Sequence, residues 1–448
     1  MSNLNTPSQR FNDDALSEWD RADVVVVGGG AAGFFTALSV KSSAPKARVC
    51  ILESASRVLS KVSISGGGRC NVTHACFDVA AFIQNYPRFN RKLAHNFHQF
   101  GVTETVEWFA RRGMPLVAEA DGRMFPTTNT SETIVTGLQR EAKKYGVPVI
   151  TQAYVTHIDV ADDESTSSDG FTLHIDGNNK QVGRTIRTQK LVLATGGSKR
   201  GYPLAEMLGH ELVEPKPSLF TFCIPDTALH ALAGVSVPDA AVSLSLEGER
   251  PKKSKKKAGW VQRGPVLVTH WGMSGPAVLK LSAWGARDLC DARYQAVMDV
   301  DWFPDTHDES LRQQLIDLKK EHGAKQIQNW PIELPQRLWV YLLEREHINV
   351  RQIGEDIPHK ALNGLAQELK HGSFRINGKG PFKEEFVTSG GVALKDIDLK
   401  TYESKKTAGM YVVGELLNVD GVTGGFNFQN AWTSAHQAGQ AIAYQLNH

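Results

Sequence analysis

The stretch from Asp23 to Gly33 constrains the fold of this chain more than any other. It reads Asp-Val-Val-Val-Val-Gly-Gly-Gly-Ala-Ala-Gly, so a run of β-branched residues meets the spacing G-x-G-x-x-G. Four consecutive valines predict a short strand buried in a parallel sheet. In such a motif Gly28 permits a tight turn, Gly30 lets the backbone approach a pyrophosphate, and Gly33 lets a helix pack closely against the strand.

The residues that follow complete a dinucleotide-binding pattern. A helix expected over 31–43, starting with Ala31 and Ala32, would offer free N–H groups and a positive dipole end to a phosphate. A second strand over 48–52 ends at Glu53, where a carboxylate can accept hydrogen bonds from a ribose. This order favours a dinucleotide site over a purely structural turn. The acid favours a free 2′-hydroxyl, and therefore FAD or NAD over NADP.

Composition limits the class of protein. A chain of 448 residues with 41% hydrophobic and 22% charged residues predicts two or three globular domains. The net charge of +2 gives no general case for nucleic acid or an acidic membrane as partner, and no stretch is long and apolar enough to insert into a membrane. Residues 1–20 lack the apolar core of a signal peptide and are expected to be a disordered lead-in. The five cysteines form no C-x-x-C pair, which favours a cytoplasmic protein with reduced thiols. Oligomeric state is not indicated.

A second glycine-rich segment lies over 61–71. Its three consecutive glycines, 66–68, predict a flexible loop whose backbone lies against a flat ring or a phosphate. Arg69 would supply charge, Asn71 hydrogen bonds and Cys70 a thiol. The alternatives are a surface ion pair for Arg69 and a small buried side chain for Cys70.

The middle of the chain predicts alternating elements. Helices are expected over 78–112 and, with Ser131 as N-cap, up to residue 145. Hairpins are expected over 114–125 and 154–175, the second containing the loop 162–169. A buried strand over 190–194 ends in Thr195-Gly196-Gly197, which predicts a second close approach of backbone to a ligand.

The region from 220 to 300 predicts short strands and turns, and helices follow over 311–322, 336–346 and 360–370. The basic run Lys252–Lys257 indicates a solvated loop, with an anion or RNA patch as the alternative. His270 is a candidate proton donor, and a structural role is its alternative.

The C-terminal region repeats the opening theme. A strand over 409–413 leads to Gly414 and Glu415, and a glycine-rich loop over 421–429 precedes a helix expected over 430–445. Such a helix N-terminus, aimed at the N1 and C2 carbonyl edge of a flavin, would stabilise the reduced ring. In the alternative the helix only packs the domain together, through a buried face of Ala431, Ala435, Ala438 and Ile442.

Several motifs together give a family resemblance. Besides 26–33 they are Ile64-Ser-Gly-Gly-Gly-Arg-Cys-Asn71, Ala194-Thr-Gly-Gly197, Thr269-His-x-Gly-x-Ser-Gly-Pro276, Thr388-Ser-Gly-Gly-Val392, Glu403-Ser-Lys405 and Gly414-Glu-x-x-x-x-Asp-Gly-x-x-Gly-Gly-Phe-Asn-x-Gln429. In this order, which spans nearly the whole chain, they resemble the bacterial HI0933-like flavoproteins. Two places depart from that pattern. Leu59-Ser60 replaces a small-basic pair before Lys61, and the segment after Gly197 is shorter than in many relatives.

The resemblance implies an α/β fold with a Rossmann-like FAD-binding domain of the two-dinucleotide-binding type. A β-barrel-like domain and a helical subdomain are inserted into it. The expected boundaries are 1–20 for the lead-in, 21–204 with 388–448 for the FAD domain, 205–303 with 371–387 for the β-rich domain, and 304–370 for the helical subdomain.

The function implied is an FAD-dependent oxidoreductase acting on a small organic substrate, by reduction of an enone C=C bond or oxidation of an amine. NADH or NADPH would visit transiently as electron donor. The alternative is a nucleic-acid-associated flavoprotein, RNA-modifying or RNA-binding, that uses the Lys252–Lys257 loop; near-zero net charge weakens it. No metal site is predicted. Catalytic candidates are His270, Cys70 and Arg69.

The expected cofactor contacts come from all these segments. They are Gly28, Gly30, Ala31, Ala32, Gly33, Glu53, Ser54, Lys61, Ser65, Gly66, Gly67, Gly68, Arg69, Cys70, Asn71, Val155, Thr195, Gly196, Gly197, Gly414, Glu415, Gly424, Gly425, Phe426, Asn427 and Gln429.

Overall fold

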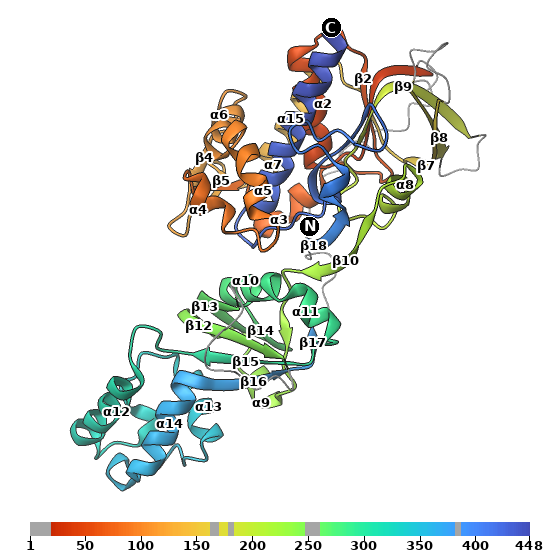
Figure 1. The fold of residues 1–448 in the computed structure, drawn as a ribbon. Coiled ribbons are helices and arrows are strands. Elements are labelled where there is room, and N and C mark those ends of the chain that lie inside the picture. Colours follow the sequence, from red (N-terminus) through yellow and green to blue (C-terminus); the bar gives the residue numbers. More distant parts are fainter. Residues whose placement is uncertain (1–18, 162–169, 178–182, 247–259, 381–386) are drawn as a thin grey trace, which may run out of the picture. The chain divides into compact units, whose positions relative to one another are not determined.

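The chain divides into two compact units in a computed structural model (Figure 1). The first unit contains residues 1–215 and 390–448, and the second contains residues 216–389. In the part of the chain that the structure describes, no helix combines the length and apolar character that a membrane crossing requires. The predicted loop 162–169, the basic run Lys252–Lys257 and most of the predicted lead-in lie outside the described residues. The structure describes residues 19–161, 170–177, 183–246, 260–380 and 387–448.

The first unit is built on a parallel sheet with β1 (Arg21–Val27) at its centre. β1 pairs in parallel with β2 (Val49–Leu52) on one side and with β9 (Arg184–Leu193) on the other. The four valines of β1 are buried, because helices cover the faces of a parallel sheet. β6 (Val149–Ile150) extends the sheet beyond β2, and β19 (Met410–Val412) pairs with β9. A C-terminal strand thus completes a sheet begun near the N-terminus.

An antiparallel hairpin continues this sheet beyond β9. β7 (Ala153–Val160) pairs with β8 (Phe171–Gly177), and β8 pairs with the first half of β9. The hairpin predicted over 154–175 is therefore confirmed.

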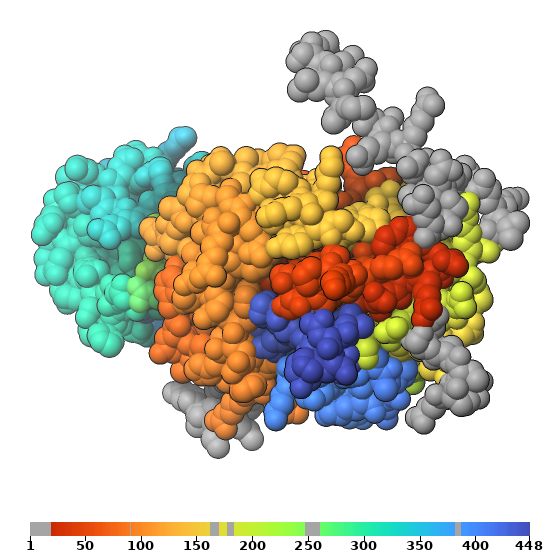
Figure 2. All heavy atoms as spheres, turned by 90° about the horizontal axis from the view of Figure 1, so that it is seen from above, coloured from red at the N-terminus to blue at the C-terminus, as the bar shows by residue number. Residues whose placement is uncertain are grey.

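Two long helices pack side by side on the parallel sheet. α2 (Ala31–Ser43) follows β1, and α15 (Phe426–Asn447) contacts it along its length; Figures 1 and 2 show α15 in blue beside the red N-terminal part of the chain. Gly439 makes this approach possible, because a Cβ there would lie 2.4 Å from the Ser39 Cβ. The predicted C-terminal helix, 430–445, starts four residues too late.

The region predicted as helical over 78–112 contains three helices. They are α4 (Val79–Ile83), α5 (Asn90–Gln99) and α6 (Val102–Ala110). Pro87 lies in the first break, where it disfavours helical backbone at the preceding residue. Gly101 is the N-cap of α6.

Short elements complete the first unit. The predicted hairpin over 114–125 is confirmed as β4 paired with β5. Ser131 is the N-cap residue of α7 as predicted, yet its hydroxyl donates to the Ser63 carbonyl at 2.8 Å instead of capping the helix. The remaining elements are α3 (Ser60–Gly68), β3 (Thr73–His74), β4 (Leu116–Ala118), β5 (Arg123–Pro126), α7 (Glu132–Lys144), α8 (Tyr202–Met207), η3 (Leu394–Asp396) and η4 (Gly414–Leu416).

The chain enters the second unit through β10 (Leu212–Ser218) and leaves it through β18 (Val387–Val392), and these two strands pair. The second unit contains a seven-stranded sheet in the order β16-β15-β12-β13-β14-β11-β17. Among the described residues this order is open, with β16 and β17 at the two edges. The strands are β11 (Phe222–Cys223), β12 (Ser236–Leu246), β13 (Val261–Thr269), β14 (Gly272–Ser274), β15 (Ala296–Asp301), β16 (Gly372–Ile376) and β17 (Gly378–Lys379).

The main helices of the second unit lie on either side of β15 in the sequence: α10 and α11 precede it, and α12, α13 and α14 follow it. The three helices predicted between residues 311 and 370 are confirmed within the stretch that joins β15 to β16. In the second unit the helices are α9 (Thr227–His230), α10 (Pro276–Trp284), α11 (Ala286–Asp291), α12 (Asp308–His322), η1 (Ile327–Asn329), α13 (Gln336–Arg345), η2 (Gly354–Asp356) and α14 (His359–His371).

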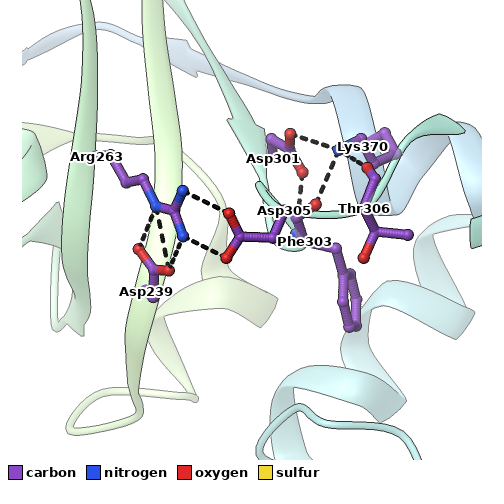
Figure 3. Close-up of polar contacts among 7 residues, drawn as sticks. All are labelled: Asp239, Arg263, Asp301, Phe303, Asp305, Thr306 and Lys370. Carbon is purple, nitrogen blue, oxygen red and sulfur yellow. Dashed lines mark hydrogen bonds and ion pairs between the residues drawn. The ribbon is translucent and has the colours of Figure 1, made fainter.

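Ion pairs fix both ends of the inserted helices to the sheet (Figure 3). At the exit, Lys370 donates to the Asp301 carboxylate at 2.7 Å and to two backbone carbonyls. At the entry, Arg263 of β13 donates to Asp305 at 2.6 and 2.7 Å and also to Asp239. Lys370 is 5% exposed, so its charge is matched by acceptors within the unit.

Candidate functional site

The first glycine turn connects β1 to the N-terminus of α2. Gly28 has φ +116° and donates its N–H to the Leu52 carbonyl at 2.8 Å. A Cβ on Gly33 would lie 1.9 Å from the Gly28 carbonyl oxygen, so only glycine lets α2 pack so closely. A Cβ on Gly30 would meet no protein atom within 4 Å. The turn is therefore closely packed at Gly28 and Gly33, whereas the space next to Gly30 contains no protein atom. Ala31 and Ala32 begin α2 beside this opening.

Glu53 lies at the end of β2, beside this turn. One carboxylate oxygen accepts the Gly29 N–H at 2.8 Å. The other accepts the Ala55 N–H at 2.7 Å and the Ser54 hydroxyl at 3.2 Å. These donors orient an acceptor at the edge of the opening.

The segment predicted as a loop over 66–68 lies within the bounds of α3 but is not regular helix, as the loop prediction expects. Its backbone leaves helical geometry at Ser65, and Gly66, Gly67 and Gly68 all have φ between +59° and +84°. A Cβ on Gly67 or Gly68 would meet nothing within 4 Å, whereas one on Gly66 would lie 2.8 Å from the Phe125 ring. This left-handed run exposes backbone, as at Gly30.

Arg69 follows that run and is bound within the protein. Its guanidinium lies 2.6 Å from Glu119 and 3.9 Å from the centre of the Phe125 ring. It also donates to Asn129. The geometry therefore matches the ion-pair alternative.

Cys70 and Asn71 point into the protein. Cys70 is fully buried, and desolvation raises the pKa of its thiol to about 12. The thiolate is therefore negligible near neutral pH, which favours the packing role. The Asn71 side chain accepts the Met124 N–H at 3.3 Å.

The carboxyl end of β9 lies near the C-terminal segment. A Cβ on Gly196 would be 3.7 Å from a Glu415 carboxylate oxygen, and that oxygen accepts from the Lys61 ammonium at 2.5 Å. The preceding residue, Thr195, has a buried hydroxyl with no hydrogen-bond partner among the described residues. Gly197 continues this turn. Segments from three parts of the sequence thus meet at one sheet edge.

Gly414 fits the C-terminal segment against α2. It donates its N–H to the Ser434 hydroxyl at 3.0 Å, and a Cβ on it would lie 2.8 Å from the Ala32 Cβ. Glu415 is therefore fixed beside the first glycine turn.

The second glycine turn leads into α15. Gly425 is the N-cap with φ +97°, and a Cβ there would lie 2.5 Å from the Thr73 carbonyl oxygen. The Asn427 side chain closes the turn, because it accepts the Gly421 N–H and donates to the Gly421 carbonyl. Phe426 is buried against the His74 ring, with centroids 4.8 Å apart.

Polar side chains on the first turns of α15 are buried. Gln429 accepts from the Thr73 hydroxyl at 2.6 Å, and its amide donors face oxygens of Gly101, Thr105 and Thr433. Gln429 thus braces the helix rather than facing the opening. By contrast, the side-chain oxygen of Asn430 is buried with no partner among the described residues.

His74 was missed by sequence reasoning. Its Nδ1 lies 3.0 Å from the Gly424 carbonyl, and its ring stacks on Phe426, so it supports the second glycine turn. Its position three residues after Asn71 was the only available signal.

Two predicted residues remain to be placed. Val155 is buried within β7 of the first unit, two residues after Ala153, whose N–H donates to the Glu53 carbonyl at 2.9 Å. His270 belongs to the second unit, in the turn between β13 and β14, where its exposed ring lies 5.7 Å from Trp271. In the described residues, no group of three or more His, Cys, Asp or Glu side chains is arranged to hold a metal.

These features fit a bound dinucleotide. Open backbone at Gly30 and Gly67 can approach phosphate or a ring, and carboxylates at Glu53 and Glu415 can accept hydroxyl donors. The Thr195 hydroxyl, in contrast, is buried against Gly201, where an added Cβ would lie 1.8 Å from it.

Several known proteins are similar to this chain in sequence or in structure. The chain is 29% identical to the ribosomal RNA dihydrouridine synthase of Escherichia coli K12, covering 94% of this chain and 98% of that protein. It is 27% identical to the 3-dehydro-bile acid delta(4,6)-reductase of Clostridium scindens, covering 93% and 98%. A flavocytochrome c3 fumarate reductase structure in an open conformation aligns with a TM-score of 0.49 and 16% identity, over 99% of this chain and 83% of that one.

The family assignment rests on a match along almost the whole chain. Residues 22–441 match the family described as the HI0933-like protein Rossmann domain. The chain therefore belongs to the HI0933-like family of FAD-dependent oxidoreductases.

Proposed function

We propose that this protein reduces a carbon–carbon double bond conjugated to a carbonyl group, with NADH or NADPH as electron donor. One observation carries this: two relatives that match over more than nine-tenths of each chain are named for such reductions. Dihydrouridine is uridine with its 5,6 double bond reduced, and that bond is conjugated to the C4 carbonyl. The bile-acid relative is named as a delta(4,6)-reductase of a 3-dehydro compound.

One molecule of NADH or NADPH supplies the two electrons that reduction of one double bond requires. A nicotinamide gives up a hydride, a proton comes from solvent or the protein, and the double bond gains both hydrogens. Bound FAD supplies the two-electron carrier between donor and substrate.

The residues of the first unit would hold the cofactor along its length. The Gly28–Gly33 turn and the α2 N-terminus would bind the pyrophosphate, and Glu53 the adenosine ribose. Glu415, with Lys61, would contact the ribityl and pyrophosphate region. The Gly424–Gly425 turn would bring the α15 N-terminus to the flavin edge where negative charge develops.

Anaerobic stopped-flow kinetics test the reaction. Flavin absorbance should bleach with NADH or NADPH and return when a 3-oxo-4,6-diene steroid is added. Reoxidation by oxygen alone, with no response to conjugated carbonyls, would contradict the proposal. In a separate aerobic assay, hydrogen peroxide formed from an aminoketone would instead support amine oxidation.

A uracil base of ribosomal RNA is the second candidate substrate. Relatives in both Escherichia coli and Haemophilus influenzae are named ribosomal RNA dihydrouridine synthase, at 29% and 27% identity. An E. coli strain that lacks its relative should regain dihydrouridine in ribosomal RNA when it expresses this chain. Nucleoside mass spectrometry decides, with Gly30→Val as the inactive control; no dihydrouridine above that control would exclude this substrate.

A further inference from the structure

Helix α5 carries only basic and uncharged residues. It contains no Asp or Glu, and Arg91, Lys92, His95 and His98 are all exposed. Spacings of three and four residues place these four side chains on the outer face, while Leu93 and the residues at 96 and 97 are buried on the other. We call these four exposed residues the basic stripe.

An exposed aromatic ring lies at the start of the stripe. Phe89 is the N-cap of α5, is 37% exposed and has φ +60°. The Lys92 ammonium lies 5.6 Å from the centre of its ring. Positive φ is unfavourable for a bulky residue, so the fold holds Phe89 outward at a cost. A cation next to an exposed aromatic ring is the combination that single-stranded nucleic acids bind.

The stripe is rigidly connected to the second glycine turn. Just before α5, Arg88 donates from Nε to the buried Asp420 carboxylate at 2.9 Å. Nearby, the Val422 N–H donates to the Asn85 carbonyl at 2.8 Å. The chain between 85 and 88 thus links the start of α5 to the turn at 420–425.

A second connection fixes the other end of α5. The Asn96 side chain donates to the Gln437 side chain at 2.6 Å, and Gln437 donates back to the Asn96 carbonyl at 2.9 Å. Because Gln437 belongs to α15, α5 keeps a fixed position relative to the helix that starts at this turn.

We propose that the basic stripe and Phe89 bind the backbone of single-stranded RNA beside the flavin edge. The inference rests on the second substrate candidate of the proposed function. Arg91 and Lys92 would contact phosphates, and an unstacked base would lie on Phe89. A neighbouring uracil, turned out of its stack, would then reach the turn at 420–425. RNA is favoured over an acidic protein surface, because the exposed Phe89 ring beside Lys92 can stack on a base and because two relatives are named for action on ribosomal RNA.

RNA binding by paired charge-reversal variants tests the surface. The FAD-loaded full chain is titrated into a labelled single-stranded RNA of about 20 nucleotides, with anisotropy read between 50 and 200 mM salt. Arg91→Glu/Lys92→Glu should weaken binding at least about tenfold and reduce the salt slope by about 1.4, because about 0.7 is lost for each phosphate contact. The matched control, Lys143→Glu/Lys144→Glu on the exposed end of α7, should change binding less than about twofold.

Two further variants separate loss of RNA binding from loss of folding, and stacking from charge. Arg91→Gln/Lys92→Gln should lose affinity in the same direction, with unchanged FAD content and melting temperature, which separates binding from folding. Phe89→Leu should weaken binding about tenfold with the salt slope unchanged, because stacking rather than charge is lost. Equal losses in the α5 and α7 pairs, or no loss in either, would overturn the inference.

The RNA-binding result can be separated from the result of the test for reduction of a conjugated double bond. Reoxidation of wild-type flavin by a conjugated steroid is measured separately. RNA binding that needs the stripe, without any conjugated reduction, would refute the proposed function but retain the surface. The reverse result would refute the surface alone.

Discussion

The two glycine turns of the first unit both lead into a helix N-terminus, but they differ in what surrounds them. At Gly30 an added Cβ would meet nothing within 4 Å, whereas at Gly425 it would meet the Thr73 backbone at 2.5 Å. The first turn therefore has a free surface for a ligand. The second is packed against protein and braced by Asn427 and His74. Similar motifs therefore serve different tasks: the first turn leaves space for a ligand, and the second fixes the start of a helix.

The largest effect is expected at Gly33, on the packed side of the first turn. Gly33→Ala should lower the free energy of unfolding by about 4 kcal/mol, because the new Cβ would lie 1.9 Å from a backbone oxygen. Chemical denaturation of the apoprotein measures this. Gly30→Ala is the matched control and should stay within about 0.5 kcal/mol of wild type. Equal losses in both variants would remove the distinction between the two sides of this turn.

A similar loss is expected at the second turn. Gly425→Ala should cost about 3 kcal/mol, because alanine would have to adopt φ +97° and also clash with Thr73. The measurement is the denaturation midpoint without added FAD. A variant as stable as wild type, with only FAD affinity reduced, would show that this turn is a free binding surface like the first.

Gly30→Val should affect the cofactor and not the fold. Its φ of −92° suits any residue, and the space in front of it contains no protein atom. The side chain would occupy the expected pyrophosphate position, so FAD affinity should fall at least about a hundredfold, or about 2.7 kcal/mol. Flavin fluorescence quenching measures affinity, and the apoprotein melting curve is the control. Wild-type FAD retention would place the phosphates elsewhere.

Acid pH should weaken the packing of α15, the helix that follows the second turn. Burial, followed by the Arg112 charge, lowers the pKa of His436 on α15 to about 4, below the usual value near 6.5. Neutral His436 thus stabilises the fold fully above pH 6.5, and this contribution is lost as pH falls toward 4. At pH 5 the loss is about 2 kcal/mol.

The matched variant is His436→Phe, which keeps a ring stacked near Phe100. Its unfolding free energy should fall less between pH 7 and pH 5 than that of wild type. Parallel pH profiles for the two proteins would show that another group carries the acid sensitivity.

The first turn could be predicted from sequence because its constraints are local. The valines, the spaced glycines and Glu53 act within one strand–helix–strand unit, and β1, α2 and β2 form as predicted. At the second turn the start of α15 was placed four residues too late. A glycine N-cap with positive φ lacks the side-chain signal that normally marks a helix start.

Other parts of the site depend on contacts between residues far apart in sequence. Lys61 meets Glu415, and Arg88 meets Asp420, across more than 300 residues. Burial likewise decides the chemistry of Cys70, because its high pKa arises from desolvation that no local pattern shows. The prediction of helical structure over 78–112 did not locate the breaks at Pro87 and Gly101.

The cofactor released by the purified protein tests the central claim most directly. One FAD is expected to lie against the first glycine turn and the C-terminal segment of each chain. Heat denaturation followed by chromatography should release FAD at close to one per chain, after reconstitution if necessary. FMN alone, or no flavin from well-folded protein incubated with FAD, would contradict the account.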